Sequence, residues 1–350
     1  MKFVGIAPIQ QSADPLTGQV PGETELFRRV VATAVLFEEL GFDGFAIGER
    51  HHVPFLATSP AVVLSHIAAL TSRIRLFTGV ALLSLHDPVR FAEEYATLDH
   101  LSGGRLEVII GKGAGPQQAE LFGLTPDRQR EALQEKYRLL HRLWTERDVT
   151  WRGSVRPPLA YATTFPRPLQ QPPRIWHGSA TSLESVDLAA EYGDPLVFSN
   201  ASSSTASYAW LIEHYRKRWA EFGRDPAALY TGAGTPAFYC ARTSQQALAD
   251  FRPIHDARRR LLQDLGRPPE FPTLEDFVER SPALIGSPQQ IIEKVHAQHE
   301  ILGHTLLCFS VEPDGLEPAR QRESFELFQS DVAPELRRTI PDPPWPAAAG

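Results

Sequence analysis

The amino-acid sequence predicts an α/β fold, a (β/α)8 (TIM-type) barrel with inserted loops. Eight short apolar segments alternate with amphipathic, helix-like segments along the 350 residues. Such alternation requires a parallel sheet with right-handed crossover connections. The last strand-like and helix-like segments could close this sheet onto its first strand, which favours a barrel over an open doubly wound sheet. No Rossmann fingerprint opposes this choice, because Gly111-x-Gly113-x-Gly115 lacks the second spacing and is followed by Pro116.

The first four strands and their helices follow from local signals. Ser59-Pro60 and Asp87-Pro88 each combine an N-cap with a first-turn proline, and Gly41 ends the first helical pattern. The expected strands are residues 2–8, 42–48, 74–83 and 106–110, and the expected helices are 23–40, 60–70, 88–102 and 128–145.

The second half repeats the alternation, with two interruptions. Thr181 with Glu184 and Ser287 with Gln290 have capping-box spacing at two helix starts. The expected strands are 175–176, 196–198, 230–241 and 305–311, and the helices are 181–192, 205–222, 244–264, 288–302 and 317–337. Insertions near 146–172 and 266–284 break the rhythm. We therefore expect one barrel domain over 1–340 and a Pro/Ala-rich tail over 341–350.

Composition narrows the class of protein. The net charge of −7 provides no basic footprint for nucleic acid. No window is apolar enough to span a bilayer, and Met1 leads directly into a strand without a signal peptide, so we expect a cytoplasmic protein that binds no membrane. Cys240 and Cys308 lie far apart in apolar runs and are expected to be buried free thiols. No metal site is expected, because zinc-type histidine spacing beside a glutamate base is missing.

Barrels carry their active sites at the C-terminal ends of strands. The second strand ends in Glu49, Arg50, His51 and His52. A histidine pair can act as general acid or base, because imidazole titrates near neutral pH. The alternative is an ordinary solvated loop with one exposed and one packed histidine.

Two further strand ends suggest a bound anion and a flat ligand. Gly178, Ser179, Thr181 and Ser182 place hydroxyls and free N–H groups at a helix N-terminus, which favours an anion such as phosphate, and Lys112 could add a positive charge. The alternative is that these residues only cap the helix. The run of Thr78 and Gly79 in a buried strand suggests that a flat group lies against the backbone, unless it reflects only tight packing.

These stretches together resemble the bacterial luciferase-like flavin-dependent monooxygenases. The resemblance extends over nearly the whole chain in the right order. It is carried by residues 38–43, 48–52, 71–75, 78–80, 87–94, 98–105, 178–182, 189–193, 284–288 and 332–337. The family pattern implies a (β/α)8 barrel, usually a homodimer. It also implies reduced FMN from a separate flavin reductase, which reacts with O2 to a C4a-(hydro)peroxyflavin and oxygenates a small organic substrate.

The resemblance also implies roles for individual residues. His51 and His52 match the catalytic histidine pair. Residues 78–80 (Thr78, Gly79 and Val80) match the strand behind the isoalloxazine ring, with a non-prolyl cis peptide at Gly79–Val80. The phosphate-binding residues would be Gly178, Ser179, Thr181 and Ser182, with Lys112 and Gly113 from the neighbouring strand end.

Two departures from the family pattern and two alternatives remain open. The loop over 178–184 is slightly longer than in many members, which leaves open which hydroxyl reaches the phosphate. The family pattern is Glu-His-His, whereas Arg50 separates Glu49 from His51 here, so either histidine could occupy the catalytic position. Glu93, Asp99 and Arg105 match the family too and are interpreted as structural, ion-paired charges.

The alternatives are a coenzyme F420-dependent oxidoreductase on the same barrel and a non-catalytic flavin-binding relative. The substrate itself is beyond reach. Trp151, Tyr161 and Phe165 suggest either an apolar substrate at the barrel mouth, or a packed lid or dimer contact.

Overall fold

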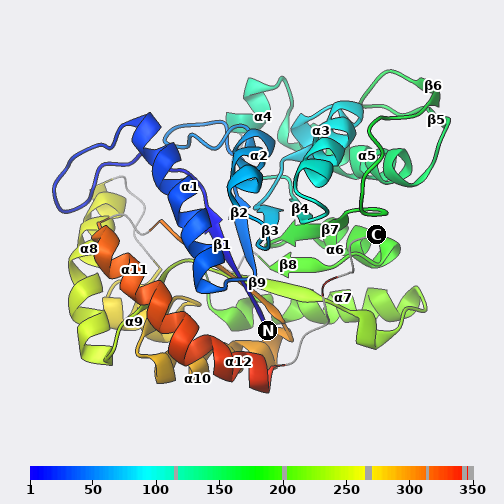
Figure 1. Ribbon diagram of the computed structural model, residues 1–350. Helices are drawn as coiled ribbons and strands as arrows, with labels where there is room; N and C mark the ends of the chain where they lie inside the picture. Colours follow the sequence, from blue (N-terminus) through cyan, green and yellow to red (C-terminus); the bar gives the residue numbers. More distant parts are fainter. Residues whose placement is uncertain (114–116, 199–202, 265–269, 313–314, 341–344, 346–350) are drawn as a thin grey trace.

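The computed structural model describes residues 1–113, 117–198, 203–264, 270–312, 315–340 and 345. Its centre is a closed parallel barrel with the strand order β1-β12-β9-β8-β7-β4-β3-β2, and helices surround it (Figure 1). The ring closes because β1 pairs with both β2 and β12. The predicted (β/α)8 barrel is therefore confirmed.

All eight predicted barrel strands are present, most of them shorter than expected. They are β1 (Lys2–Ala7), β2 (Gly44–Ile47), β3 (Arg75–Thr78), β4 (Leu106–Ile110), β7 (Arg174–Ser179), β8 (Leu196–Phe198), β9 (Thr231–Thr235) and β12 (Leu306–Ser310). Every residue of β2, β3 and β4 is buried. Helices cover the outer face of these strands and side chains fill the inner face, which explains why most of their residues are apolar.

The predicted helices are also present, and several begin at the expected caps. They are α1 (Glu23–Leu40), α2 (Pro60–Leu70), α3 (Pro88–Leu101), α5 (Pro126–Thr145), α6 (Leu183–Tyr192), α7 (Ala209–Glu221), α8 (Ser244–Asp264), α10 (Pro288–Leu302), α11 (Pro318–Leu327) and α12 (Ala333–Thr339). The Asp87 side chain accepts from the Val89 N–H, and Ser287 with Gln290 forms a complete capping box. A π-helical turn, Phe328–Val332, joins α11 to α12.

The structure corrects two expected element boundaries and adds two strand pairings. The expected strand 230–241 divides at Pro236 into β9 and β10 (Phe238–Cys240), because proline has no N–H to continue a ladder. β10 leaves the barrel and pairs with β11 (Leu284–Gly286) inside the second insertion. The first insertion forms an antiparallel hairpin, β5 (Val149–Trp151) and β6 (Leu159–Ala162). The cap of α6 is Ser182, not Thr181.

Two short helices were not predicted. They are α4 (Gln117–Leu121) and α9 (Leu274–Arg280), and α9 begins at a Thr273 cap within the second insertion. None of the helices in the described ranges is long and apolar enough to cross a membrane. Cys240 and Cys308 are buried free thiols, as expected. Of the 341–350 tail only Trp345 lies within the described residues.

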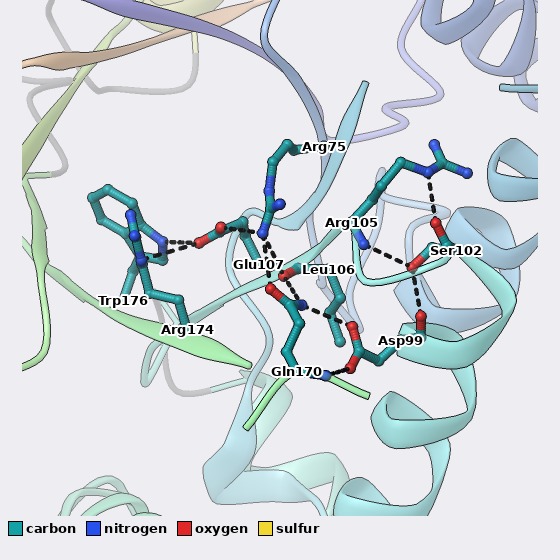
Figure 2. Close-up of polar contacts among 9 residues, drawn as sticks. All are labelled: Arg75, Asp99, Ser102, Arg105, Leu106, Glu107, Gln170, Arg174 and Trp176. Atoms are coloured by element: carbon teal, nitrogen blue, oxygen red, sulfur yellow. Dashed lines mark hydrogen bonds and ion pairs between the residues drawn. The ribbon is translucent and has the colours of Figure 1, made fainter. Parts of the chain in front are cut away.

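The N-terminal end of the barrel is filled by a buried polar network (Figure 2). The Glu107 carboxylate is fully buried and lies 2.6 Å from Arg75 Nη2. It also accepts a 2.7 Å hydrogen bond from Trp176 Nε1, and Arg174 Nε lies 3.9 Å away. Burial raises the pKa of Glu107, and the two arginines oppose that effect. These contacts supply hydrogen bonds and counter-charge to the Glu107 carboxylate, the one acidic group in β4.

Neighbouring polar groups extend this network. Gln170 donates to both Asp99 carboxylate oxygens, through its backbone N–H at 2.8 Å and its side-chain amide at 2.7 Å. Arg105 donates to backbone carbonyls, among them Ser102 O at 2.7 Å and Ile74 O at 3.0 Å. Asp99 and Arg105 are structural, as interpreted from the sequence. In the part of the chain described here, their contacts are neutral amides and carbonyls instead of the expected ion pairs.

Trp345 covers this end of the barrel. Its ring lies 4.8 Å from Lys2 Nζ, 5.1 Å from the Arg75 guanidinium and 5.8 Å from that of Arg174. Aromatic rings attract cations through their quadrupole. A residue from the end of the chain therefore packs over the charges that surround Glu107.

Candidate active site

The opposite, C-terminal end of the barrel opens into a cavity of about 1630 Å³. Most of the predicted cofactor-binding residues line it together: Gly79, Val80, Lys112, Gly113, Gly178, Ser179, Thr181 and Ser182. Thr78 does not line it. Its hydroxyl is buried and donates to the Ile109 carbonyl at 2.7 Å, which ties β3 to β4. Thr78 supports the cavity floor from behind.

Val80 forms a firm part of the cavity wall. The Gly79–Val80 peptide is cis, as the family resemblance implied. A Cβ added to Gly111 would lie 2.8 Å from Val80 Cγ2, and one added to Gly178 would lie 2.9 Å from Val80 Cγ1. Such separations are closer than real contacts allow, so the Val80 side chain occupies space that exists only because both neighbours are glycines. The backbone of three strand ends thereby forms one close-packed surface.

Hydroxyl and N–H groups gather beside this surface at the N-terminus of α6. The Ser179 hydroxyl accepts from the Ser182 N–H at 3.2 Å, and the Ser182 hydroxyl accepts from the Ser185 N–H at the same distance. Ser182 also donates to the Glu184 carboxylate at 2.9 Å. The two serines therefore cap the helix, as the alternative interpretation held, while Thr181 and Ser182 still face the cavity.

Two basic residues face the same helix end. The pKa of Glu184 is lowered first by hydrogen bonds from its own N–H and from Ser182, and then by the charges of Arg130 and Lys112. Arg130, on α5, lines the cavity and was not predicted. In the sequence, the one indication that Arg130 could face the site was its position near the N-terminus of the helix that begins at Pro126. Partial positive charge at a helix N-terminus, the Thr181 side chain facing the cavity and two cations make this corner suitable for an anion.

Glu49, at the end of β2, is buried and fully engaged. It is 3% exposed and accepts from the Leu82 N–H at 2.8 Å. Its other oxygen lies 2.9 Å from His51 Nε2 and 2.8 Å from His86 Nε2. Burial alone would raise the pKa of Glu49, but the hydrogen bonds from His51 and His86 outweigh burial and lower it to about 2. His86, which sequence reasoning missed, thus completes a His–Glu–His group.

The predicted histidines lie behind the cavity wall. His51 is turned toward Glu49, and its ring packs edge-on against Phe122 at 4.8 Å between ring centres. His52 Nδ1 lies 2.9 Å from the Val53 carbonyl, and its ring packs against Phe55. Among the described residues that line the cavity, Glu49 and Arg50 represent this loop and neither histidine does. Their catalytic role stays a prediction; His51 contacts the cavity-lining Glu49, and His52 contacts the cavity-lining Phe55.

Arg50, which lies between Glu49 and His51 in the sequence, lines the cavity. Its guanidinium carbon lies 4.6 Å from the centre of the Phe55 ring. Its side chain is half-buried, and burial lowers the pKa of the guanidinium. Within the described ranges, this guanidinium makes no hydrogen bond or ion pair.

The outer wall of the cavity is largely apolar. It comes from β10, α8 and the second insertion, which contribute Phe238, Phe251, Ile254, Phe271 and Phe277. Exposed arginines at 258 and 260 stand at its edge. Trp151, Tyr161 and Phe165 are not part of the described cavity wall, and Tyr161 is 80% exposed on the hairpin. Of the two alternatives for these aromatic residues, a contact with a substrate in this cavity is not supported, whereas the second insertion does contribute to the wall.

Comparison with known proteins decides the family. The model of the luciferase-like monooxygenases matches residues 1–305. The chain belongs to this family. Membership in the luciferase-like monooxygenase family makes the protein an oxidoreductase and confirms the resemblance seen in the sequence.

Individual relatives agree over most of the chain. It is 28% identical over 335 residues to 4-hydroxyprotoasukamycin monooxygenase of Streptomyces nodosus subsp. asukaensis, covering 89% of this chain and 87% of that protein. Monooxygenase RslO1 from Streptomyces bottropensis has the same fold, with 24% identity, a TM-score of 0.82, and 96% and 99% of the two chains covered.

Solved structures with the same fold differ in cofactor. The oxygenating constituent of 3,6-diketocamphane monooxygenase from Pseudomonas putida, solved with FMN, has a TM-score of 0.78 at 21% identity, covering 98% and 99% of the chains. The coenzyme F420-dependent tetrahydromethanopterin reductase from Methanopyrus kandleri has a TM-score of 0.71 at 16% identity, covering 95% and 99%. At these identities the likeness concerns the fold.

Proposed function

We propose that this luciferase-like protein is a two-component, flavin-dependent monooxygenase. It would accept reduced FMN from a separate flavin reductase and use O2, through a C4a-(hydro)peroxyflavin, to oxygenate a small organic substrate. The observation that carries the proposal is the adjacency, in one cavity, of the close-packed surface at Gly79–Val80 and the anion-binding corner at α6. A cytoplasmic homodimer belongs to the same proposal.

The residues of the cavity fit FMN in kind. Gly79, Val80 and Gly178 would back the flat ring, because little side chain stands between the backbone and the cavity there. Thr181 would donate to the phosphate, Ser182 would do so in place of its hydrogen bond to Glu184, and Lys112 and Arg130 would balance the phosphate charge. Ser179 and Gly113 would shape the backbone around it. When bound, the reduced flavin supplies the electrons that activate O2.

The histidines would handle protons from behind the wall. Glu49 faces the cavity and is held by His51 and His86, so a proton on either imidazole is one carboxylate away from the cavity. Imidazole exchanges protons near neutral pH. His52 lies beside this group and would set the conformation of the loop.

Parallel titrations test the cofactor. Purified protein is titrated with FMN, reduced FMN and coenzyme F420, and the reduced complex is mixed with O2 in a stopped-flow spectrometer. We expect reduced FMN to bind and a flavin intermediate distinct from direct reoxidation to accumulate. Tight binding of F420 alone would establish the alternative F420-dependent oxidoreductase. Binding without reactivity toward either O2 or a hydride acceptor would establish a non-catalytic relative.

The double replacement His51→Ala/His52→Ala tests the proton role. Positioned acid–base groups contribute about 100- to 10,000-fold to rates, so we expect turnover to fall at least about 100-fold. Reduced-FMN affinity should stay nearly unchanged, because neither side chain lines the cavity. Lys112→Gln is the matched control and should weaken FMN binding instead. Loss of flavin binding in the histidine variant would show that the roles are assigned wrongly.

A further inference from the structure

We propose that Arg50 recognises an anionic group on the substrate, so that the substrate combines a carboxylate, or a comparable acidic group, with an apolar body. This inference rests on the proposed function for the position of the flavin. It makes Arg50 the specificity-determining residue of the loop that carries the histidine pair.

The strand order places Arg50 on the substrate side of the cavity. In the ring, β3 and β4 separate β2 from β7, while β1 and β12 separate β2 from β9. The phosphate corner lies at β7 and the close-packed surface at β3, so a flavin would extend from β7 across β4 to β3. The space that remains is bounded by the ends of β2, β1, β12 and β9. Arg50 stands at the β2 side of this space.

The Arg50 guanidinium is held in place without an acidic partner. The backbone N–H of Arg50 donates to the Ala57 carbonyl at 2.8 Å, and the Phe55 ring lies against the Arg50 side chain. The loop is fixed in turn, because the Leu56 N–H donates to Ile9 O and the Gln11 N–H donates to Pro54 O. A half-buried cation without a counter-charge is unfavourable, so an anion entering the cavity would be attracted to it.

The acidic side chains of the cavity wall have other partners. Glu49 is occupied by two histidines and the Leu82 N–H. Asp14 accepts from Leu16 and Thr17. The other three acids of the described wall are likewise engaged: Glu184 by Ser182, Glu270 by Ser203 and Glu312 by the Gln10 N–H. None of these described carboxylates pairs with the Arg50 guanidinium, so an anionic group of a ligand would find it available.

The other residues of the cavity wall indicate the chemistry of the remainder of the ligand. The part of the wall formed by β10, α8 and α9 includes apolar side chains, Phe238, Phe251, Ile254 and Phe277, beside the arginines at 258–260. Such a wall favours an apolar or aromatic body. Arginine stays charged throughout the accessible pH range, so recognition by Arg50 would not depend on pH near neutrality. A histidine in the same role would lose its charge there.

Matched acid and amide probes test the assignment. Protein saturated with oxidised FMN is titrated with 2-naphthoate and 2-naphthamide, and with benzoate and benzamide, by isothermal calorimetry. Each pair differs in charge and hardly in shape. We expect the wild type to bind the acid about 10- to 100-fold more tightly, the range of one charge-assisted hydrogen bond. The preference should stay constant from pH 6 to pH 9.

Three variants locate the preference. Arg50→Gln should abolish it, Arg50→Lys should retain part of it, and Arg258→Gln, at the exposed edge of the same cavity, should retain all of it. FMN affinity and the melting temperature of Arg50→Gln are measured in parallel, so that unfolding or flavin loss is recognised. The proposal is overturned if the wild type binds acid and amide equally, if the preference survives Arg50→Gln, or if it titrates near neutral pH.

The two proposals fail in different ways. If FMN does not bind to the wild type, the proposed function fails. The acid–amide comparison is then made on flavin-free protein and still tests Arg50. If FMN binds and reacts but no acid preference exists, only the assignment of Arg50 is wrong.

Discussion

The two ends of the barrel differ in whether their charged side chains have partners of opposite charge. At the N-terminal end, Glu107 is enclosed by Arg75, Arg174 and Trp176 (Figure 2). Trp345 packs over this group. At the C-terminal end, Arg50 stands in an open cavity on Phe55 without a described counter-charge. Glu49, beside Arg50, resembles the buried end because each of its oxygens is engaged. Charges that stabilise the barrel are satisfied internally, whereas Arg50 lines the cavity without an acidic partner among the described residues.

Replacing Glu107 should have the largest effect and tests the enclosed end. Glu107→Ala leaves two arginines buried without their acid, and breaking a buried ion pair from one side costs about 3–5 kcal/mol. We expect the free energy of unfolding in urea to fall by that amount. Glu93→Ala, which removes a more exposed pair with Arg90, is the control and should cost at most about 1 kcal/mol. Equal stability of the two variants would contradict the comparison.

The pH dependence of stability tests whether Glu49 belongs with the enclosed charges. The pKa of Glu49 is about 2 in the folded protein instead of 4.5, so folding favours its charged form. Its contribution is present above about pH 4.5 and is lost as the pH falls toward 2, and it amounts to about 3 kcal/mol. Urea unfolding of wild type and Glu49→Gln should therefore differ by about that amount at pH 6 and converge near pH 2. A difference that stays constant with pH would show that Glu49 is not held as a carboxylate.

Removing the Trp345 ring should have the smallest effect and tests how far the two ends are independent. Trp345→Ala removes contacts with three cations, each worth about 0.5–1 kcal/mol when partly exposed, so we expect a loss of about 1–2 kcal/mol in unfolding free energy. FMN affinity should not change, because the ring lies at the end remote from the cavity. Trp210→Ala, at a 44% exposed tryptophan on α7, is the control and should leave stability unchanged. A change in FMN affinity would show that the ends are coupled.

The barrel could be predicted because its signals are local. Asp87-Pro88 starts a helix by its own chemistry, and β2 is apolar whatever surrounds it. The split at Pro236 had a local signal too, since a proline inside a central strand argues against continuity. The partner of β10 had none, because β11 lies more than forty residues further along the chain.

The residues of the candidate site also differ in whether local sequence signals could predict them. The glycines and hydroxyls at Gly79 and Ser182 could be placed at strand ends from the sequence and family pattern. Which residue of the 49–52 loop faces the cavity could not, because that depends on hydrogen bonds to Ile9 and Gln11 far earlier in the chain. Glu107 was missed for the same reason: its partners Arg75 and Arg174 lie on other strands.

The packing of Val80 between Gly111 and Gly178 also determines how this enzyme can be diversified. A side chain at either glycine would displace Val80, so the inner wall tolerates little substitution. Ile254 and Phe271 of the outer wall are also buried, but neither lies between two strand-end glycines. Directed evolution toward new substrates should therefore vary the outer wall, around positions such as Ile254 and Phe271, and leave the inner three strand ends unchanged.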